Sequence, residues 1–171
     1  MQLLEDQLDK LVQKIVKACE FLTIAIGGWL AIALIANVFF RFVLNSSLTW
    51  VDESSALLLV CLMLAVAPIG FHEYIHISVD ILLARLSHLL KSILLIFINA
   101  CSILLFSITG YFGFFMVLDD FQTQMASIPI MQGWFTFFLP IASVFVILVC
   151  TNNMVRILRK QDFPKKMRDT Q

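Results

Sequence analysis

Four long stretches without a charged residue constrain this sequence more than any other feature. They run over residues 21–40, 54–71, 92–118 and 121–155. A helix needs about 20 apolar residues to cross roughly 30 Å of hydrocarbon, so each stretch is long enough or nearly so. The first third of the last stretch is polar and broken. We therefore predict an all-α membrane protein with a four-helix membrane domain over residues 19–155, whose transmembrane helices cover about 19–40, 54–71, 92–118 and 134–154.

Two further segments have the pattern of amphipathic helices. In residues 1–18, apolar side chains recur at helical spacing, and charged or amide side chains occupy the other face. Residues 76–91 repeat this pattern between the second and third spans. Such segments lie in the membrane interface, parallel to its plane. We predict an N-terminal interfacial helix and a second in-plane helix, while a helix docked on a partner protein is the alternative for the first.

The distribution of Lys and Arg predicts the orientation. If the four spans are correct, alternate sides of the membrane carry 11 and 1 of the 12 basic residues. Positive charge is retained on the cytoplasmic side. Both termini and the middle loop should therefore be cytoplasmic, and residues 156–171 should form a basic cytoplasmic tail.

One short motif suggests an enzyme. His72-Glu73-Tyr74-Ile75-His76 matches H-E-x-x-H, in which two histidines one helical turn apart bind zinc and the glutamate is the general base. A catalytic zinc site also needs a third ligand and a cavity for substrate. Asp80 or His88 could be the third ligand, but the motif straddles the end of a span, and no segment remains to build a cleft. We expect no metal, no cofactor and no catalysis, with a membrane zinc protease as the alternative.

The predicted spans contain no Asp, Glu, Lys, Arg or His in their cores. Ion-coupled transporters usually carry such a side chain inside the membrane. Glu20, at the inner end of the first span, is the sole acid near a span core on that side, at a depth where water reaches it. A stand-alone four-helix exporter that uses Glu20 is a further alternative, but we expect the chain not to move solute alone.

Residues 41–59 hold a group of polar and aromatic side chains between the first two spans. Arg41 ends the first span, Trp50 is placed at the interface, and Asp52 and Glu53 open the second span. A Ser or Thr at a helix start can cap the helix, and the acids that follow interact favourably with the helix dipole. Arg41 can reach these acids across the short loop. We predict that this group fixes the hairpin, contacts a partner, or does both.

These residues, followed by His76 and Asp80, resemble the small membrane subunit of tripartite ATP-independent periplasmic (TRAP) transporters, the DctQ family. Ile128-Pro129 before the last span, and Pro140 within it, which we expect to kink the helix, are also similar. The resemblance covers about residues 21–153. The chain departs from the family at one place, since it has Asp-Glu where two glutamates are common.

The resemblance implies a role in transport. In this family a large membrane subunit moves substrate by a sodium-driven elevator motion, and a periplasmic binding protein delivers an organic acid such as sialic acid or a C4-dicarboxylate. The small subunit packs against the stationary scaffold and has no transport site. This chain would then be a non-catalytic subunit in the bacterial inner membrane. Its partners would be the large subunit, in an obligate heterodimer, the binding protein and membrane lipids, with no nucleic acid. General similarity favours sialic acid over a dicarboxylate.

The resemblance also implies roles for individual residues. The four hairpin residues above would fix the contact with the large subunit. His76 and Asp80 would fix the turn into the in-plane helix. Asp119 and Asp120 lie in an outer loop without Lys or Arg, and we expect them to help receive the binding protein.

Overall fold

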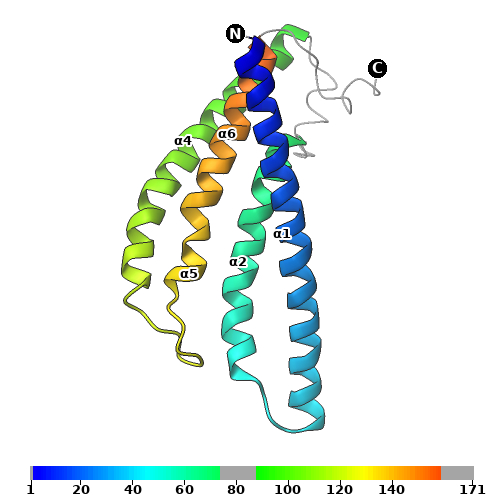
Figure 1. Ribbon diagram of the computed structural model, residues 1–171, viewed down its shortest axis with the longest axis vertical. Coiled ribbons are helices and arrows are strands. Elements are labelled where there is room, and N and C mark those ends of the chain that lie inside the picture. Colours follow the sequence, from blue (N-terminus) through cyan, green and yellow to red (C-terminus); the bar gives the residue numbers. More distant parts are fainter. Residues whose placement is uncertain (1, 74–87, 159–171) are drawn as a thin grey trace.

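The computed structural model describes residues 2–73 and 88–158. Its helices, in chain order, are α1 (Gln2–Val43), α2 (Thr49–His72), α4 (His88–Asp120), α5 (Gly133–Thr136) and α6 (Phe138–Leu158) (Figure 1). By length and composition, four segments could cross a membrane: Gln7–Val43, Thr49–His72, Leu90–Asp120 and Gly133–Leu158, the last combining α5 and α6. The prediction of an all-α chain with four membrane-spanning helices is confirmed.

The N-terminal segment is continuous with the first span. Residues 2–43 form one uninterrupted helix, so the separate interfacial helix predicted at 1–18 is not confirmed. Some of the apolar side chains of this segment face the rest of the chain, while Leu8 and Leu11 stay exposed. Val12 and Val16 are 2% and 5% exposed, and they pack with Val149 of α6 and Ile69 of α2. Val12 and Val16 therefore have a protein partner within the chain itself.

The in-plane helix predicted at 76–91 lies mostly outside the described residues. Its last four positions, 88–91, form the start of α4. His76 and Asp80 also lie outside the described residues, so their predicted role stays a prediction.

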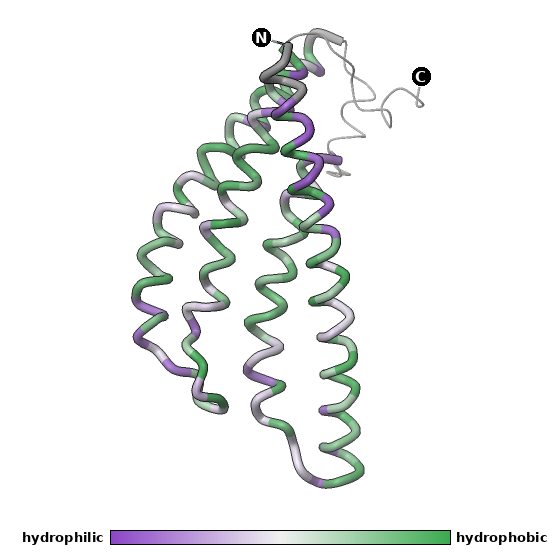
Figure 2. Tube along the Cα trace, viewed as in Figure 1, coloured by the Kyte–Doolittle hydropathy of each residue, from purple (hydrophilic) through white to green (hydrophobic). Residues whose placement is uncertain are grey.

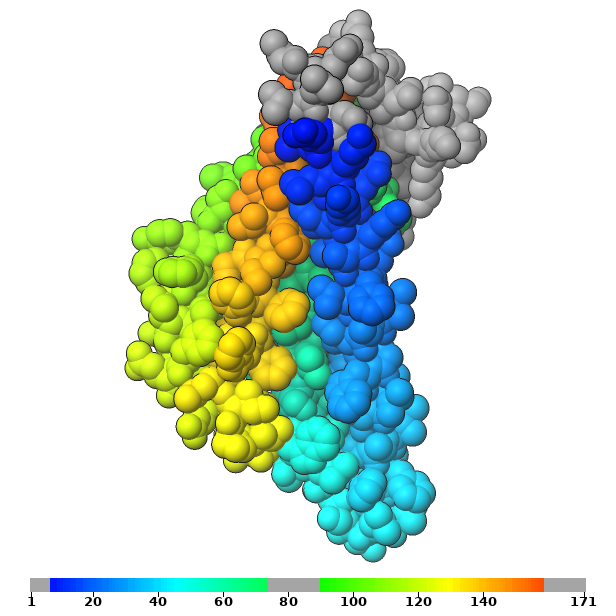
Figure 3. Space-filling model, in the orientation of Figure 1, coloured from blue at the N-terminus to red at the C-terminus, as the bar shows by residue number. Residues whose placement is uncertain are grey.

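The long helices stand side by side in the order α4, α6, α2, α1 (Figure 1). α1 packs on α2, α2 on α6, and α6 on α4, while the N-terminal part of α1 also reaches α6. Apolar residues cover most of each helix, and hydrophilic ones concentrate in the N-terminal part of α1 and near the loops (Figure 2). Figure 3 shows one broad face of the row, on which all four long helices reach the surface. A row has less interior than a bundle, so much of its apolar surface stays exposed.

Glycines allow the close approach of α4 to α6. A Cβ atom on Gly110 would lie 3.2 Å from the Cβ of Ser143, and one on Gly113 would lie 2.8 Å from a methyl carbon of Leu139. Small residues at a helix contact let two backbones approach closely. The α4–α6 contact therefore depends on the missing side chains of these two glycines.

The last span is interrupted near Pro140, where we expected a kink. α5 ends at Thr136 and α6 begins at Phe138, and Phe137 between them keeps helical dihedral angles of φ −58° and ψ −23°. Proline has no N–H to donate to the carbonyl four residues earlier, and its ring crowds that carbonyl. For Pro140 that carbonyl belongs to Thr136, the last residue of α5. The interruption between α5 and α6 therefore lies one turn before the proline.

Candidate functional site

Polar side chains gather at the two ends of the row. The loop end contains the α1–α2 loop and the loop 121–132 between α4 and α5 (Figure 1). The terminal end contains the N-terminal part of α1 and the C-terminal part of α6. Of the eight residues singled out from the sequence, three accept hydrogen bonds at the loop end through their side chains: Asp52, Glu53 and Asp120.

Asn37 connects α1 to the start of α2. Its side chain is only 6% exposed. The amide nitrogen donates a hydrogen bond of 2.7 Å to Oδ1 of Asp52, and the amide oxygen accepts the N–H of Leu48 at 3.0 Å. Both polar atoms of this asparagine are thereby satisfied, which a buried amide requires. These two hydrogen bonds of Asn37 hold the start of α2 and the residue before it against α1.

Glu53 connects α2 to the loop 121–132. One oxygen of its carboxylate accepts the backbone N–H of Ala126 at 2.9 Å, and the other accepts the N–H of Ser127 at 2.8 Å. Two N–H donors on one carboxylate form charge-assisted hydrogen bonds, which are stronger than neutral ones. Glu53 therefore fixes the loop to the hairpin.

The loop 121–132 also folds on itself. The N–H of Met125 donates to the carbonyl of Ile130 at 3.0 Å, and the N–H of Gln132 donates to that of Thr123 at 3.1 Å. The Met125 side chain is 4% exposed. The loop is a compact hairpin with a buried side chain beneath it, and its N–H groups at 126 and 127 are left for Glu53.

The expected contact of Arg41 with the acids is not seen. Arg41 is exposed, and within the described residues it forms no ion pair or hydrogen bond. The polar partner of Asp52 is Asn37 instead. Trp50 is 39% exposed at the start of α2. The predicted Ser or Thr cap is wrong, because the residue before α2 is Leu48 and no side chain caps the helix.

The two aspartates at the end of α4 differ in their surroundings. Asp119 is exposed. Asp120 is partly buried, and the hydroxyl of Thr136 on α5 donates a hydrogen bond to its carboxylate. Asp120 thus holds α5 against the end of α4. Asp119 is the aspartate of the two that is exposed on the surface.

The terminal end holds a second polar network, which the sequence reading missed. Asp9 of α1 forms a 2.9 Å ion pair with Arg156 of α6, and the amide of Asn152 donates to the same carboxylate oxygen at 2.8 Å. The amide of Asn153 donates to the carbonyl of Phe71 at 2.9 Å. The signal in the sequence was the pair of adjacent amides in an otherwise apolar span. This network holds α1, α2 and α6 together.

The H-E-x-x-H motif lies only partly within the described residues. His72 is partly buried at the end of α2, and Glu73 follows it. Over 2–73 and 88–158, no group of three or more His, Cys, Asp and Glu side chains could hold a metal ion.

The comparisons with known proteins agree with this architecture. The family model described as "Tripartite ATP-independent periplasmic transporters, DctQ component" matches residues 30–160. This range takes in α2, α4, α5, α6 and the loop-end residues from Asn37 onward. No curated protein matches the chain. The chain belongs to the DctQ family and is a small subunit of a TRAP transporter, a multi-pass protein of the inner membrane.

Proposed function

We propose that this chain stabilises the scaffold of the large, elevator-type membrane subunit in a sodium-coupled importer of an organic acid. The observation that carries this proposal is the open row of four apolar helices. The edge helices bury little: within the most apolar part of α1 and of α4, only 11% of the residues are buried, against 33% for α5 and α6. A row of this kind has a wide apolar surface on which another membrane protein can pack.

The uncharged helix cores support a role without a transport site in this chain. Ionisable residues inside a membrane mark ion and proton pathways. None stands in residues 21–40, 54–71, 92–118 or 134–154. Asn37, Glu53 and Asn152 form hydrogen bonds that join different segments at the two ends of the row. In this proposal the sodium ions and the substrate bind to the large subunit, with which the chain forms an obligate heterodimer.

The family supports an organic acid as the substrate, and we place sialic acid ahead of a C4-dicarboxylate on general similarity. The Lys and Arg distribution supports a cytoplasmic terminal end and a periplasmic loop end. The exposed hairpin residues Arg41 and Trp50 then face the large subunit near the periplasmic surface. His76 and Asp80 fix the turn that follows α2.

Co-purification tests the proposal. A tagged copy expressed with its neighbouring transporter proteins should bring down a large polytopic protein in comparable amount. Reconstituted together with the binding protein, the complex should take up the organic acid in response to a sodium gradient. The purified chain alone should give no uptake. Solute flux from the chain alone, abolished by Glu20→Gln, would instead establish the exporter.

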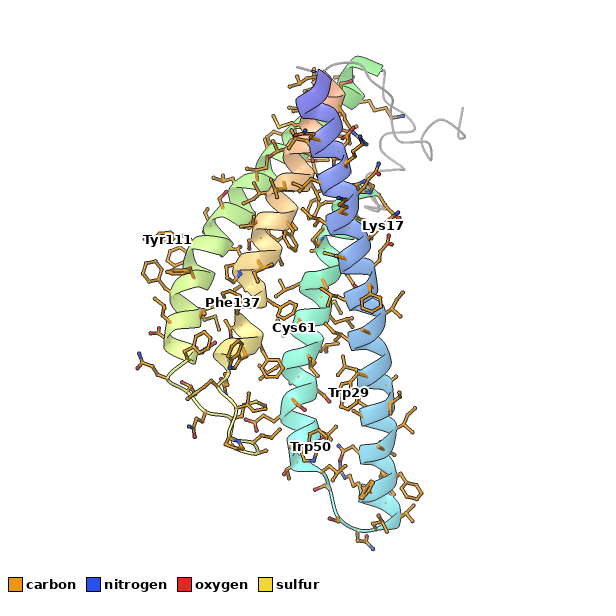
Figure 4. All side chains as sticks on the ribbon, in the orientation of Figure 1. Lys17, Trp29, Trp50, Cys61, Tyr111 and Phe137 are labelled. Atoms are coloured by element: carbon orange, nitrogen blue, oxygen red, sulfur yellow. The ribbon has the colours of Figure 1, made fainter. Side chains whose placement is uncertain are left out.

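Arg41→Ala tests the hairpin contact. Arg41 has no partner within the described residues, so its removal should leave the fold of the chain intact and lower the yield of the complex. Lys17→Ala, at an exposed lysine in the N-terminal half of α1, is the matched control (Figure 4). An unchanged complex and unchanged uptake in Arg41→Ala would remove Arg41 from the contact.

The loop end supports a second contact, with the periplasmic binding protein. Asp119 is exposed, and the loop beside it is ordered by its own hydrogen bonds and by Glu53. Asp119→Lys should weaken binding-protein docking and change its dependence on salt, since exposed charges are screened within about 10 Å at 0.1 M salt. Glu73→Lys, an exposed acid at the other end of the row, is the control. Equal docking by both variants would contradict the assignment.

A further inference from the structure

Trp29 lies in the middle of the first span. It is 12 residues from Lys17 and 12 residues from Arg41, the basic residues on either side (Figure 4). At 1.5 Å per residue, each is about 18 Å away along the helix axis. The hydrocarbon core is about 30 Å thick, so Trp29 is near its centre. A tryptophan side chain there is too short to reach the headgroups on either side.

The indole of Trp29 is exposed in this chain. It is 56% exposed. Among the described residues it has no hydrogen-bond partner. Hydrocarbon contains no acceptor for the indole N–H, and a polar group left without a partner in an apolar medium is costly. Trp50 and Trp134 do not raise this difficulty, because both lie at the loop end, where indoles commonly meet water.

The surface around Trp29 suits the approach of another helix. Ala25, Gly28 and Ile32 are exposed and lie three or four residues apart from one another or from Trp29, so they share one side of α1. A Cβ atom on Gly28 would meet nothing within 4 Å. Small residues beside a large aromatic ring form a shallow site for a neighbouring backbone. We call Ala25, Gly28, Trp29 and Ile32 the Trp29 face.

The outer side of α4, at the opposite edge of the row, presents no such indole N–H to the middle of the membrane. Its exposed large side chains include Phe97, Leu104 and Phe112, which hydrocarbon solvates well. The hydroxyl of Ser107 is satisfied by the carbonyl of Ile103 at 2.7 Å. Tyr111 lies toward the loop end of α4, on the side away from α6 (Figure 4). Its ring packs edge-on against that of Phe112. Lipid can cover this surface and leave no buried donor in the middle of the membrane.

We infer that the Trp29 face packs against a membrane-spanning helix of the large subunit, which supplies an acceptor for the indole N–H, and that the outer side of α4 contacts lipid. This inference rests on the proposed function, because it takes the large subunit as the partner. The acceptor is a Ser, Thr, Asn or Gln side chain or a free carbonyl, since lipid chains offer none. Tryptophan anchors of this kind carry much of the binding energy at protein interfaces.

Site-specific photo-crosslinking in membranes that contain the whole transporter tests the inference. A benzophenone amino acid replaces Trp29 in one variant and Phe112, which is 65% exposed on α4, in the control. Irradiation should join position 29 to the large subunit and leave position 112 without a protein adduct. A large-subunit adduct at both positions, or at position 112 alone, would overturn the inference. So would an adduct of twice the mass of this chain at position 29, which would mean that a second copy covers the face.

Trp29→Phe tests the hydrogen bond separately, because it keeps an aromatic ring and removes the donor. Hydrogen bonds between membrane helices average a fraction of a kcal/mol, so dissociation of the complex in detergent should become roughly threefold easier. Trp134→Phe, at the loop end, should leave dissociation unchanged. If the large subunit co-purifies and Trp29→Phe dissociates like the wild type, the inference fails and the proposed function stands. If no large subunit co-purifies with the wild type, the proposed function itself fails.

Discussion

The carboxylate of Glu53 accepts the backbone N–H of Ser127 at 2.8 Å, across 74 residues of sequence. The neighbouring N–H of Ala126 reaches the same carboxylate at 2.9 Å. A side chain at the start of α2 thereby orders the loop between α4 and α5. The conformation of the loop 121–132 is therefore coupled to that of the α1–α2 hairpin.

Removal of the Glu53 carboxylate should release the loop. In Glu53→Ala both N–H groups lose their acceptor, whereas Glu53→Gln keeps one carbonyl oxygen and loses the charge. Amide hydrogen exchange at Ala126 and Ser127 should therefore be slowest in the wild type, intermediate in Glu53→Gln and fastest in Glu53→Ala.

Glu73→Ala is the control for this series, because Glu73 is an exposed acid at the opposite end of α2. Exchange in the loop should stay at the wild-type rate in that variant. Equal rates in the wild type and Glu53→Ala would show that the loop holds its conformation without the carboxylate.

The buried asparagines Asn37 and Asn99 should respond differently to replacement by leucine. Asn37→Leu leaves the N–H of Leu48 without its acceptor and Asp52 without its donor, so it should destabilise the fold by about 1–3 kcal/mol. Asn99 donates only to the carbonyl of Leu95 one turn earlier, which already accepts a helical hydrogen bond. Asn99→Leu should be nearly neutral. Thermal unfolding in detergent measures both, and equal losses would mean that the hairpin contact adds no stability.

The four spans could be predicted because each is a local property of the sequence. Twenty uncharged apolar residues specify a membrane helix whatever surrounds them. The arrangement of the helices in a row could not be predicted, because an apolar stripe in a membrane protein faces lipid or protein equally well. The same ambiguity explains the N-terminal segment. Val12 and Val16 would fit the apolar side of an interfacial helix, yet they pack against α2 and α6, while Leu8 and Leu11 stay exposed.

The polar partners of the predicted hairpin residues differ from those that the sequence suggested. Asp52 bonds across the α1–α2 hairpin to Asn37, whereas Glu53 accepts backbone N–H groups of the loop 121–132, which carry no signature in the side-chain sequence. Arg41 was the expected partner of Asp52 and Glu53 because of its charge and its nearness in sequence. Asn37, a neutral residue inside the apolar block, takes that place because it is buried beside Asp52 and needs a partner for each of its polar atoms.

The Asp9–Arg156 ion pair should contribute little stability by itself. Both side chains are more than a third exposed, at 35% and 39%. Partly exposed pairs of this kind are worth about 0.2–1 kcal/mol and weaken with salt. A double-mutant cycle of Asp9→Asn and Arg156→Gln should give a coupling energy in that range at low salt and a smaller one at high salt. The pair Asp9→Asn and Lys14→Gln should show none, and a coupling that does not depend on salt would contradict an electrostatic origin.

Gly113→Ile should separate α4 from α6. Even the first carbon of a side chain at position 113 would lie 2.8 Å from Leu139, so a branched side chain has to displace that residue or the helix. Overpacking of this kind costs about 1–3 kcal/mol. Gly28→Ile makes the same chemical change on α1 where nothing lies within 4 Å, so the unfolding temperature of the isolated chain should be unaffected or slightly raised. Thermal unfolding of the two variants in the same detergent compares them directly. A Gly113→Ile protein as stable as Gly28→Ile would mean that α4 is free to move away from α6 without loss.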